Sequence, residues 1–308
     1  MTASAPSTYK GLAEEPAAAE QDHERRRFRL RRPSLWHLVL IPISAILLFP
    51  FYLMVVTSLQ TEVQTRRFPP LLIPPTPQWA NYADALNAAP FVRFMVNSAV
   101  VALIIVAGNL VLCSIAGYAF ARLRFLGRGA LFGVLMATLM VPFQVTMIPE
   151  FLIVKWFGTN VWSQLGIDHL GALIMPNLAT AFGIFLLRQF FGALPPELIE
   201  AAELDGASQL QFLRTIAAPL ARPALITIGL YIFIGSWNSF LWPFIMTSSP
   251  SVQPIEVGLS TFFGTNGTDW TGLSAAVVFT TLPIMIVFML SQRRLVEGAS
   301  ATTGGMKG

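Results

Sequence analysis

Six long apolar runs constrain this chain more than any other feature of its sequence. Each is near or above the roughly 20 residues that a helix needs to cross a hydrocarbon layer about 30 Å thick. Because backbone polar groups cannot stay unpaired in lipid, runs of this length predict transmembrane helices. The expected fold is therefore all-α, a polytopic membrane protein with six transmembrane helices. The runs lie at about residues 36–58, 94–117, 130–150, 170–190, 223–247 and 272–291.

The composition agrees with this prediction and excludes an ordinary soluble domain. Hydrophobic residues make up 54% of the 308 residues and charged residues 12%. Soluble domains average about 45–50% apolar and about 25% charged residues. The sequence shows no internal repeat, and the segments between the apolar runs contain no soluble domain.

Basic residues predict the orientation of the six helices, because an excess of Lys and Arg marks cytoplasmic loops. If the N-terminus lies inside the cell, only four of the 20 basic residues fall outside it, namely Arg66, Arg67, Arg93 and Lys155. We therefore expect a multi-pass plasma-membrane protein with both termini in the cytoplasm.

The first 35 residues differ in character from the rest. They are rich in Ala, Ser, Glu and Arg and show no apolar period, so they cannot bury enough surface to fold alone. We expect a disordered cytoplasmic tail over residues 1–35 and a six-helix transmembrane domain over residues 36–308. The run that starts at residue 36 is too long for the core of a signal peptide, which predicts an uncleaved first helix.

A polar segment over residues 192–222 separates the fourth and fifth apolar runs. Pro195 and Pro196 favour the start of a helix. Asp205 and Gly206 predict a tight reversal, because Gly adopts the positive φ that such a turn requires.

The second half of this segment predicts another short helix. Ser208 with Gln211 fits a capping box at its start. Apolar residues then follow at three- and four-residue spacing, which predicts one apolar stripe along a helix. They are Leu210, Leu213, Ile216 and Leu220.

A helix-turn-helix with an apolar face at a membrane surface is suited to a groove in a partner protein. The alternative is an amphipathic element lying on lipid, but such elements are usually rich in Lys or Arg. This segment instead carries Glu197, Glu200, Glu203 and Asp205, which anionic lipid would repel. Docking to a protein is therefore favoured.

The triplet Glu200-Ala201-Ala202 resembles the EAA motif in the permease subunits of bacterial binding-protein-dependent ABC transporters. In that motif a Gly follows the last Ala by four residues, and an Ile and a Pro follow the Gly by ten and thirteen residues. Gly206, Ile216 and Pro219 match this spacing. The resemblance implies that the segment couples to an ATPase subunit. The contact residues it implies are Glu200, Ala201, Ala202, Asp205, Gly206, Ile216 and Pro219.

Other stretches extend the resemblance to the sugar-uptake permeases of the maltose type. They are Gly117–Arg122, Arg124-Phe125 with Gly127-Arg128, Pro142–Val145, Trp237-Asn238 with Phe240–Pro243, and the C-terminal residues 292–308. The resemblance implies the type I permease fold of ABC importers from about residue 36 to the end. It also implies a bacterial inner-membrane location and three kinds of partner, namely a second permease subunit, a pair of ATPase subunits and an extracytoplasmic solute-binding protein.

The chain lacks the residues that would let it drive transport by itself. A phosphate-binding P-loop requires Gly-Lys followed by Ser or Thr, and each of the three lysines here follows Tyr, Val or Met. The expected spans hold no Asp, Glu or Lys in their interiors, with Glu150 and Arg188 placed at span ends, so no ion relay is visible. We expect no cofactor in this chain, with ATP and Mg bound by the partner subunits.

No catalytic or metal site is predicted. His23, His37 and His169 show no ligand spacing, and Cys113, alone in the second run, fits a small core residue. Nothing indicates an enzyme acting by itself, and we expect no nucleic-acid partner.

Polar residues inside the apolar runs are candidates for the solute path. Trp237 and Asn238 suit a sugar, because an aromatic face packs on a pyranose ring while an amide binds its hydroxyls. Packing between helices is an equal alternative for this pair. Gln144 and Asn109 are weaker candidates. Trp242 is assigned to the aromatic belt at the outer interface.

These observations lead to one hypothesis. The chain is expected to be the non-catalytic permease subunit of an ATP-driven ABC importer that takes up a carbohydrate by alternating access. Two alternatives stay open, an ABC permease for a phosphorylated polyol such as glycerol phosphate and a stand-alone secondary transporter or channel.

Overall fold

The computed structural model describes residues 36–264 and 267–304, with side chains described as far as Gln292. It divides into two compact units at the boundary between Tyr52 and Leu53. The first unit contributes most of helix α2 (Trp36–Ser58), and the second holds every other described element. The predicted tail over residues 1–35 lies outside the described residues.

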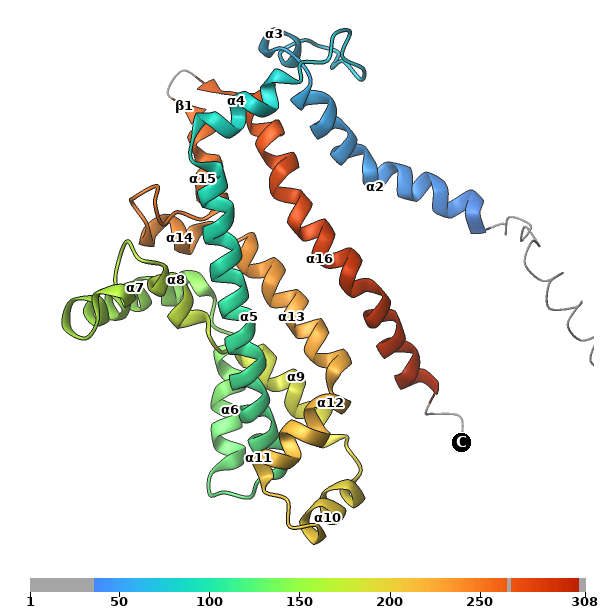
Figure 1. The fold of residues 1–308 in the computed structure, drawn as a ribbon, viewed down its shortest axis with the longest axis vertical. Coiled ribbons are helices and arrows are strands. Elements are labelled where there is room, and N and C mark those ends of the chain that lie inside the picture. Colours follow the sequence, from blue (N-terminus) through green and yellow to red (C-terminus); the bar gives the residue numbers. More distant parts are fainter. Residues whose placement is uncertain (1–35, 265–266, 305–308) are drawn as a thin grey trace, which may run out of the picture. The chain divides into compact units, whose positions relative to one another are not determined.

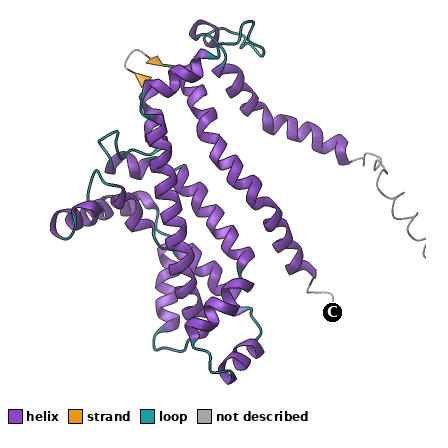
Figure 2. Ribbon diagram, viewed as in Figure 1, coloured by secondary structure: helices purple, strands orange, loops and turns teal. Residues whose placement is uncertain are grey.

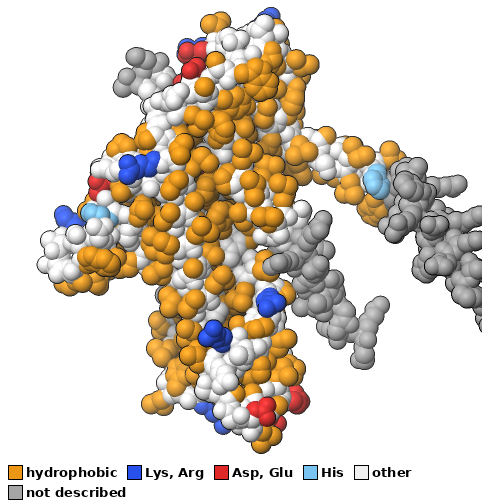
Figure 3. All heavy atoms as spheres, in the orientation of Figure 1, with side chains coloured by type: hydrophobic (Ala, Val, Ile, Leu, Met, Phe, Trp, Pro, Cys, Tyr) orange, Lys and Arg blue, Asp and Glu red, His pale blue; other side chains and the backbone are white. Residues whose placement is uncertain are grey.

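The described chain is built almost entirely of helices, as Figure 2 shows. Four of them are long and apolar enough to cross a membrane, at Trp36–Ser58, Phe91–Arg122, Leu170–Gly192 and Trp270–Gln292. Two bent helix pairs also pass this test, which gives up to six spans. Hydrophobic side chains cover most of the face seen in Figure 3, as expected of a surface that meets lipid. The predicted all-α, polytopic fold is confirmed.

One continuous helix was expected for the third apolar run, residues 130–150, but the structure shows a break in it. Helix α6 (Arg128–Thr138) and helix α7 (Phe143–Asn160) meet at an angle of 104°. Pro142 stands at the junction in an extended conformation, with φ −62° and ψ 140°. Proline lacks an amide donor and restricts the residue before it, which explains why the helix breaks here.

The fifth apolar run is also interrupted. Helix α13 (Arg222–Trp237) ends well before residue 247, and helix α14 (Leu241–Met246) restarts the chain after three residues. Pro243 explains the gap, because its ring would clash with the carbonyl of Ser239 in a continuous helix. The fourth run also leaves regular α-helix. It passes from α8 (Leu170–Ile174) through a 3₁₀ turn, η3 (Met175–Asn177), to α9 (Ala181–Gly192).

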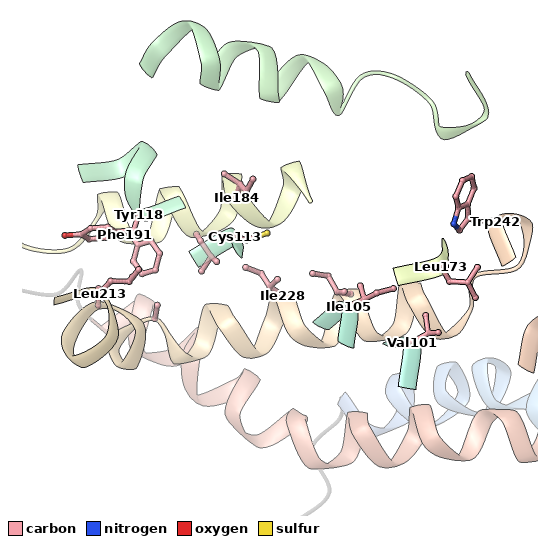
Figure 4. Close-up of a cluster of buried hydrophobic side chains, with 14 of the residues drawn as sticks. Val101, Ile105, Cys113, Tyr118, Leu173, Ile184, Phe191, Leu213, Ile228 and Trp242 are labelled. Atoms are coloured by element: carbon pink, nitrogen blue, oxygen red, sulfur yellow. The ribbon is translucent and has the colours of Figure 1, made fainter. Parts of the chain in front are cut away.

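Helix α5 (Phe91–Arg122) is the central element of the second unit. It packs most extensively against α9 and α13 (Figure 1). Gly117 allows the close approach to α9, because a Cβ there would stand 2.9 Å from the Cβ of Leu187. Figure 4 shows side chains of the core between these helices. They include Val101, Ile105, Cys113, Tyr118, Leu173, Ile184, Phe191, Leu213, Ile228 and Trp242.

A second apolar cluster packs α5 and α13 against helix α16 (Trp270–Gly304) and the short helices α4 (Ala80–Ala88) and α15 (Ile255–Gly258). Phe91 at the start of α5 stacks on Phe262 with ring centroids 5.4 Å apart. This cluster joins the last long helix to the N-terminal half of α5.

Outside residues 192–222, the remaining elements are short. They are α3 (Glu62–Thr65), η2 (Ser163–Leu165), η5 (Leu259–Phe262) and the two-residue strands β1 (Phe263–Gly264) and β2 (Gly267–Thr268), which pair antiparallel. The stretch from Phe68 to Pro77 forms no helix, as its prolines predict. The hairpin is a minor departure from the all-helical expectation.

We predict that Gly117→Ala destabilises the bundle by about 1–3 kcal/mol, because the added methyl group overpacks the contact between α5 and α9. The readout is the apparent melting temperature of the purified protein in detergent. Gly133→Ala in α6 is the matched control, since no atom lies within 4 Å of a Cβ there. Equal melting temperatures for the two variants would contradict the close packing at Gly117.

Candidate functional site

The polar segment over residues 192–222 folds as the helix-turn-helix expected from its sequence. Helix α10 (Pro196–Leu204) begins immediately after Pro195. The chain then reverses at Asp205 and Gly206, and Gly206 has a φ of +76°. That left-handed conformation strains any residue with a Cβ, so the turn depends on glycine at this position.

The second half of the segment consists of α11 (Gln209–Phe212), a π-helical turn η4 (Leu213–Ala217) and α12 (Ala218–Leu220). Ser208 caps α11, because its Oγ accepts a hydrogen bond from the Gln211 amide at 3.3 Å. This is the first of the two bonds in the predicted capping box. The segment then meets α13 at an angle of 81°.

The predicted apolar stripe does not form as expected. Leu213 and Ile216 turn inward, but Leu210 is 65% exposed and Leu220 is 48% exposed. For Leu220 the π-helical turn is the physical reason, because it widens the helical repeat and rotates the residues that follow it. Leu210 precedes that turn and is exposed on α11. The buried face is formed instead by Phe212, Leu213 and Ala217.

The residues predicted to contact an ATPase fall into two groups. Glu200, Ala201, Asp205 and Gly206 are exposed on α10 and its turn. The other group, Ala202, Ile216 and Pro219, is buried or half-buried. Leu204, which the sequence analysis did not single out, is 89% exposed beside the turn.

Two side chains of α5 tie this segment to the helical bundle. Tyr118 donates a hydrogen bond from its Oη to Oε1 of Gln209 at 2.6 Å, and its ring lies edge-on to Phe191. Arg122 donates to the carbonyl oxygen of Phe191 at 2.9 Å and also to that of Leu194. The segment is therefore held to α5 and to the end of α9 through directed contacts.

The sequence analysis named Tyr118 and Arg122 only as part of the stretch Gly117–Arg122, which resembles sugar-uptake permeases, and assigned neither residue a structural role. A structural role for Gln209 was missed, because its partner lies 91 positions away in the chain. The polar residue Tyr118 near the end of an apolar run was the available signal.

Two of the predicted path residues are buried between helices. Asn109 is fully buried, and its Nδ2 donates to the carbonyl oxygens of Ile105 at 3.0 Å and Asn177 at 2.7 Å. Trp237 is 2% exposed, and its Nε1 donates to the carbonyl oxygen of Thr280 at 3.2 Å. Both side chains pair with backbone groups of the bundle within this chain.

The other two predicted path residues, Asn238 and Gln144, are exposed. Asn238 lies in the break between α13 and α14, and Gln144 lies at the start of α7. Trp242 is placed differently from its assignment to the aromatic belt. It is buried, and its Nε1 donates to the carbonyl oxygen of Ala172 at 3.1 Å.

Two neighbouring hollows of about 190 Å³ and about 780 Å³ share Asn177, Thr180, Ser239 and Trp242 in their walls. We call the larger one the polar hollow. Its walls include the break between α6 and α7 at Leu139. Helices α7, α8 and α14 lie on one side of α5 in Figure 1. The polar residues lining the two spaces are Ser98, Thr138, Thr146, Glu150, Asn177, Thr180, Tyr231, Ser236 and Ser239.

Three helix breaks therefore meet at the polar hollow. Irregular backbone within a membrane is tolerated where it is buried in protein or lines a water-filled space. Discontinuous helices also frame solute sites in other transporters. This arrangement makes the polar hollow the candidate solute path. Within the residues that the structure describes, no three His, Cys, Asp or Glu side chains gather in a way that could hold a metal ion.

Comparison with known proteins places this geometry in a family. The model of the family "Binding-protein-dependent transport system inner membrane component" matches residues 109–300. The chain belongs to this family. It is therefore a permease, the membrane component of an ABC importer, and the predicted type I permease fold is confirmed.

Individual relatives agree with the family assignment. The permease is 33% identical over 270 residues to the sn-glycerol-3-phosphate transport system permease protein UgpE of Yersinia pestis bv. Antiqua (strain Antiqua), covering 85% of this chain and 94% of that protein. It is 32% identical over 275 residues to UgpE of Rhizobium meliloti (strain 1021), covering 86% and 95%.

A solved structure shares the fold. A bacterial ABC transporter involved in the import of the acidic polysaccharide alginate contains a chain with a TM-score of 0.70 and 23% sequence identity, covering 85% of this permease and 98% of that chain.

A carboxylate clasp lies between α8 and α14 in this permease. Asp168, just before α8, accepts hydrogen bonds from the amides of Ser248 at 2.9 Å and Ser249 at 2.8 Å, and from the Ser249 hydroxyl. In return, the Asp168 amide donates to the carbonyl oxygen of Met246 at 2.8 Å. The bonds from Ser249 hold the pKa of Asp168 below its ordinary value. The clasp joins the start of α8 to the end of α14.

We predict that Asp168→Asn lowers the melting temperature at pH 7 by roughly 2–4 °C, corresponding to about 1 kcal/mol of lost hydrogen bonding. Because the folded pKa lies below the ordinary value of 3.8, this stabilisation is complete above that pH and is lost as the pH falls through the folded pKa. The difference between wild type and variant should therefore shrink at low pH. Asp84→Asn, on the exposed face of α4, is the control, and a gap that does not change with pH would contradict the clasp.

Proposed function

We propose that this permease carries a carbohydrate into the cell by alternating access, driven by ATP hydrolysis in separate ATPase subunits. The observation that carries the proposal is the helix-turn-helix segment. It presents an exposed acidic turn around Asp205 and is tied to α5 and α9 on its other side. One side of the segment is exposed to a partner and the other is hydrogen-bonded to the helical bundle. This arrangement is suited to passing a partner's movement to the membrane helices.

The proposed ATPase contact consists of Glu200, Ala201, Asp205 and Gly206 at the surface, with the less exposed Ala202, Ile216 and Pro219 as its other members. Leu204 adds an exposed apolar side chain that is suited to a pocket of the partner. This chain then hydrolyses nothing itself and binds no cofactor, and ATP and Mg belong to the ATPase subunits.

The proposed assembly contains two permease subunits, of which this chain is one, two ATPase subunits and an extracytoplasmic solute-binding protein. The family description supports a binding-protein-dependent system. A structure of the alginate transporter in complex with a pentasaccharide-bound periplasmic protein supports the binding protein as a partner. The excess of basic residues supports an orientation with the helix-turn-helix segment and both termini in the cytoplasm.

The proposed path passes through the polar hollow. Its walls combine hydroxyl and amide groups with the indole of Trp242, a mixture that is suited to a polyhydroxylated solute. Asn238 and Gln144 are exposed near this region and stay candidates for contacts along the path. Asn109 and Trp237 are assigned to helix packing instead. A second candidate solute is glycerol 3-phosphate, which the names of the relatives favour.

The deciding experiment is reconstitution of this chain in vesicles, alone and with its genomic partners. We expect solute accumulation only when ATPase subunits, binding protein and ATP are all present. Accumulation against a concentration difference by the isolated chain would overturn the proposal in favour of a stand-alone transporter.

We predict that Gly206→Val uncouples ATP hydrolysis from uptake and lowers uptake at least tenfold. Valine at a φ of +76° costs about 1–2 kcal/mol or more in strain and shifts the turn. The open space around Gly206 leaves room for the side chain, so the protein should still fold. Uptake and ATPase rate are measured together in the reconstituted importer.

Gly133→Val in α6 is the control for this experiment, because that glycine is also unobstructed but has no left-handed conformation. Normal uptake by the Gly206→Val importer would contradict the role of the turn. Loss of the protein from the membrane in both variants would point to a folding defect in place of uncoupling.

A further inference from the structure

The feature behind this inference is Glu150, which sequence reasoning placed at the end of a span. The structure places it instead in the middle of α7 (Phe143–Asn160), where it lines the polar hollow. It is half-buried. Within the described part of the chain, its carboxylate has neither a hydrogen-bond partner nor an ion pair, so its oxygens are available to a solute.

No Lys, Arg or His is among the described residues that line the polar hollow or the smaller space beside it. The nearest cation along α7 is Lys155, five residues further on. It is turned away from Glu150 by about 140° around the helix axis. The walls therefore carry one full negative charge and no full positive charge.

The N-termini of two helices add a smaller, positive contribution to the electrostatic potential in the hollow. Helices α7 and α9 both begin at the polar hollow, and each N-terminus is equivalent to roughly half a positive charge within its first turn. At α9 this end is already capped, since Thr180 Oγ accepts from the Gly183 amide at 3.1 Å. Because the α9 end is capped, the two partial charges offset Glu150 only in part, and the hollow keeps a net negative charge.

From this balance we propose that the polar hollow passes uncharged polyhydroxylated solutes and rejects phosphate esters, with Glu150 as the specificity-determining residue. This inference rests on the proposed function. The Glu150 carboxylate accepts hydrogen bonds from solute hydroxyls, and the hydroxyls of Thr146, Thr180 and Ser239 complete the polar lining. A phosphate monoester carries about −1.5 to −2 charges at pH 7, and the hollow offers it no guanidinium or ammonium partner. The names of the UgpE relatives therefore do not carry over to the solute of this chain.

A chemical test of the hollow's charge needs no knowledge of the solute. Thr146→Cys, one helical turn before Glu150 on α7, is labelled in the full importer with methanethiosulfonates that carry a sulfonate or a trimethylammonium group. We expect Glu150→Gln to raise the ratio of anionic to cationic labelling rates on the order of tenfold, because it removes the repulsion. An unchanged ratio would overturn the inference.

Two controls accompany the labelling. Thr159→Cys lies nine residues beyond Glu150 on α7, about 13.5 Å along the axis, and does not line the hollow. Its ratio should not respond to Glu150→Gln. The importer without an introduced cysteine reports any reaction at the buried Cys113.

A transport assay then tests the selectivity itself. The reconstituted importer is given radiolabelled maltose, glycerol and sn-glycerol 3-phosphate in turn, with ATP. We expect ATP-dependent uptake of an uncharged solute, at least tenfold slower uptake of the phosphate ester, and a smaller difference for Glu150→Gln. ATP-dependent uptake of glycerol phosphate as fast as that of the uncharged solutes would overturn the inference but leave the proposed function intact. Accumulation without ATP or ATPase subunits would instead count against the proposed function.

Discussion

The pairing of backbone groups in a low-dielectric surrounding is the constraint on which the rest of this structure depends. A continuous helix satisfies it within itself, but Pro142, Pro176 and Pro243 lie at or next to points where three of the apolar runs leave regular helix. The freed backbone groups must then face protein or water. In this chain the three breaks lie around one hollow. The positions at which backbone groups lose their helical hydrogen bonds are therefore also those that line a polar space.

Helix α5 connects that polar space to the helix-turn-helix segment. Asn109 bonds the carbonyl oxygen of Asn177 at the wall of the hollow, and Tyr118 bonds Gln209 in the segment. The two residues are nine positions apart, or about 13.5 Å along a straight helix. Close packing at Gly117 and the bonds of Arg122 limit sliding between α5 and α9. We therefore propose that α5 passes a shift of the segment to the walls of the hollow, where the buried Asn109 bonds the backbone of Asn177.

The sequence predicted the features that depend on local chemistry. Lengths of apolar runs predicted the membrane helices, and Gly206 predicted the reversal in the polar segment, because both follow from backbone requirements. It did not predict the features that depend on distant partners. The rotation of Leu220 out of the apolar face follows from a π-helical turn, and the indole of Trp242 bonds a carbonyl group 70 positions earlier in the chain. Residue type alone could not separate two roles for Trp237 and Asn109, since a polar group in an apolar run can contact a solute or bond a neighbouring helix.

Charge, more than fold, discriminates among solutes in a path of this kind. The relatives named for glycerol phosphate and the alginate transporter share the architecture of this chain but differ in the charge and size of what their names say they carry. One architecture thus accommodates different solutes, and the side chains at the helix breaks must supply the difference. Here the polar members of the lining are hydroxyls, an amide, an indole and a single carboxylate, set among apolar side chains. Because α7 is set at 104° to α6, the middle of α7 lines the hollow, and the bend at Pro142 is what gives Glu150 its influence over the solute.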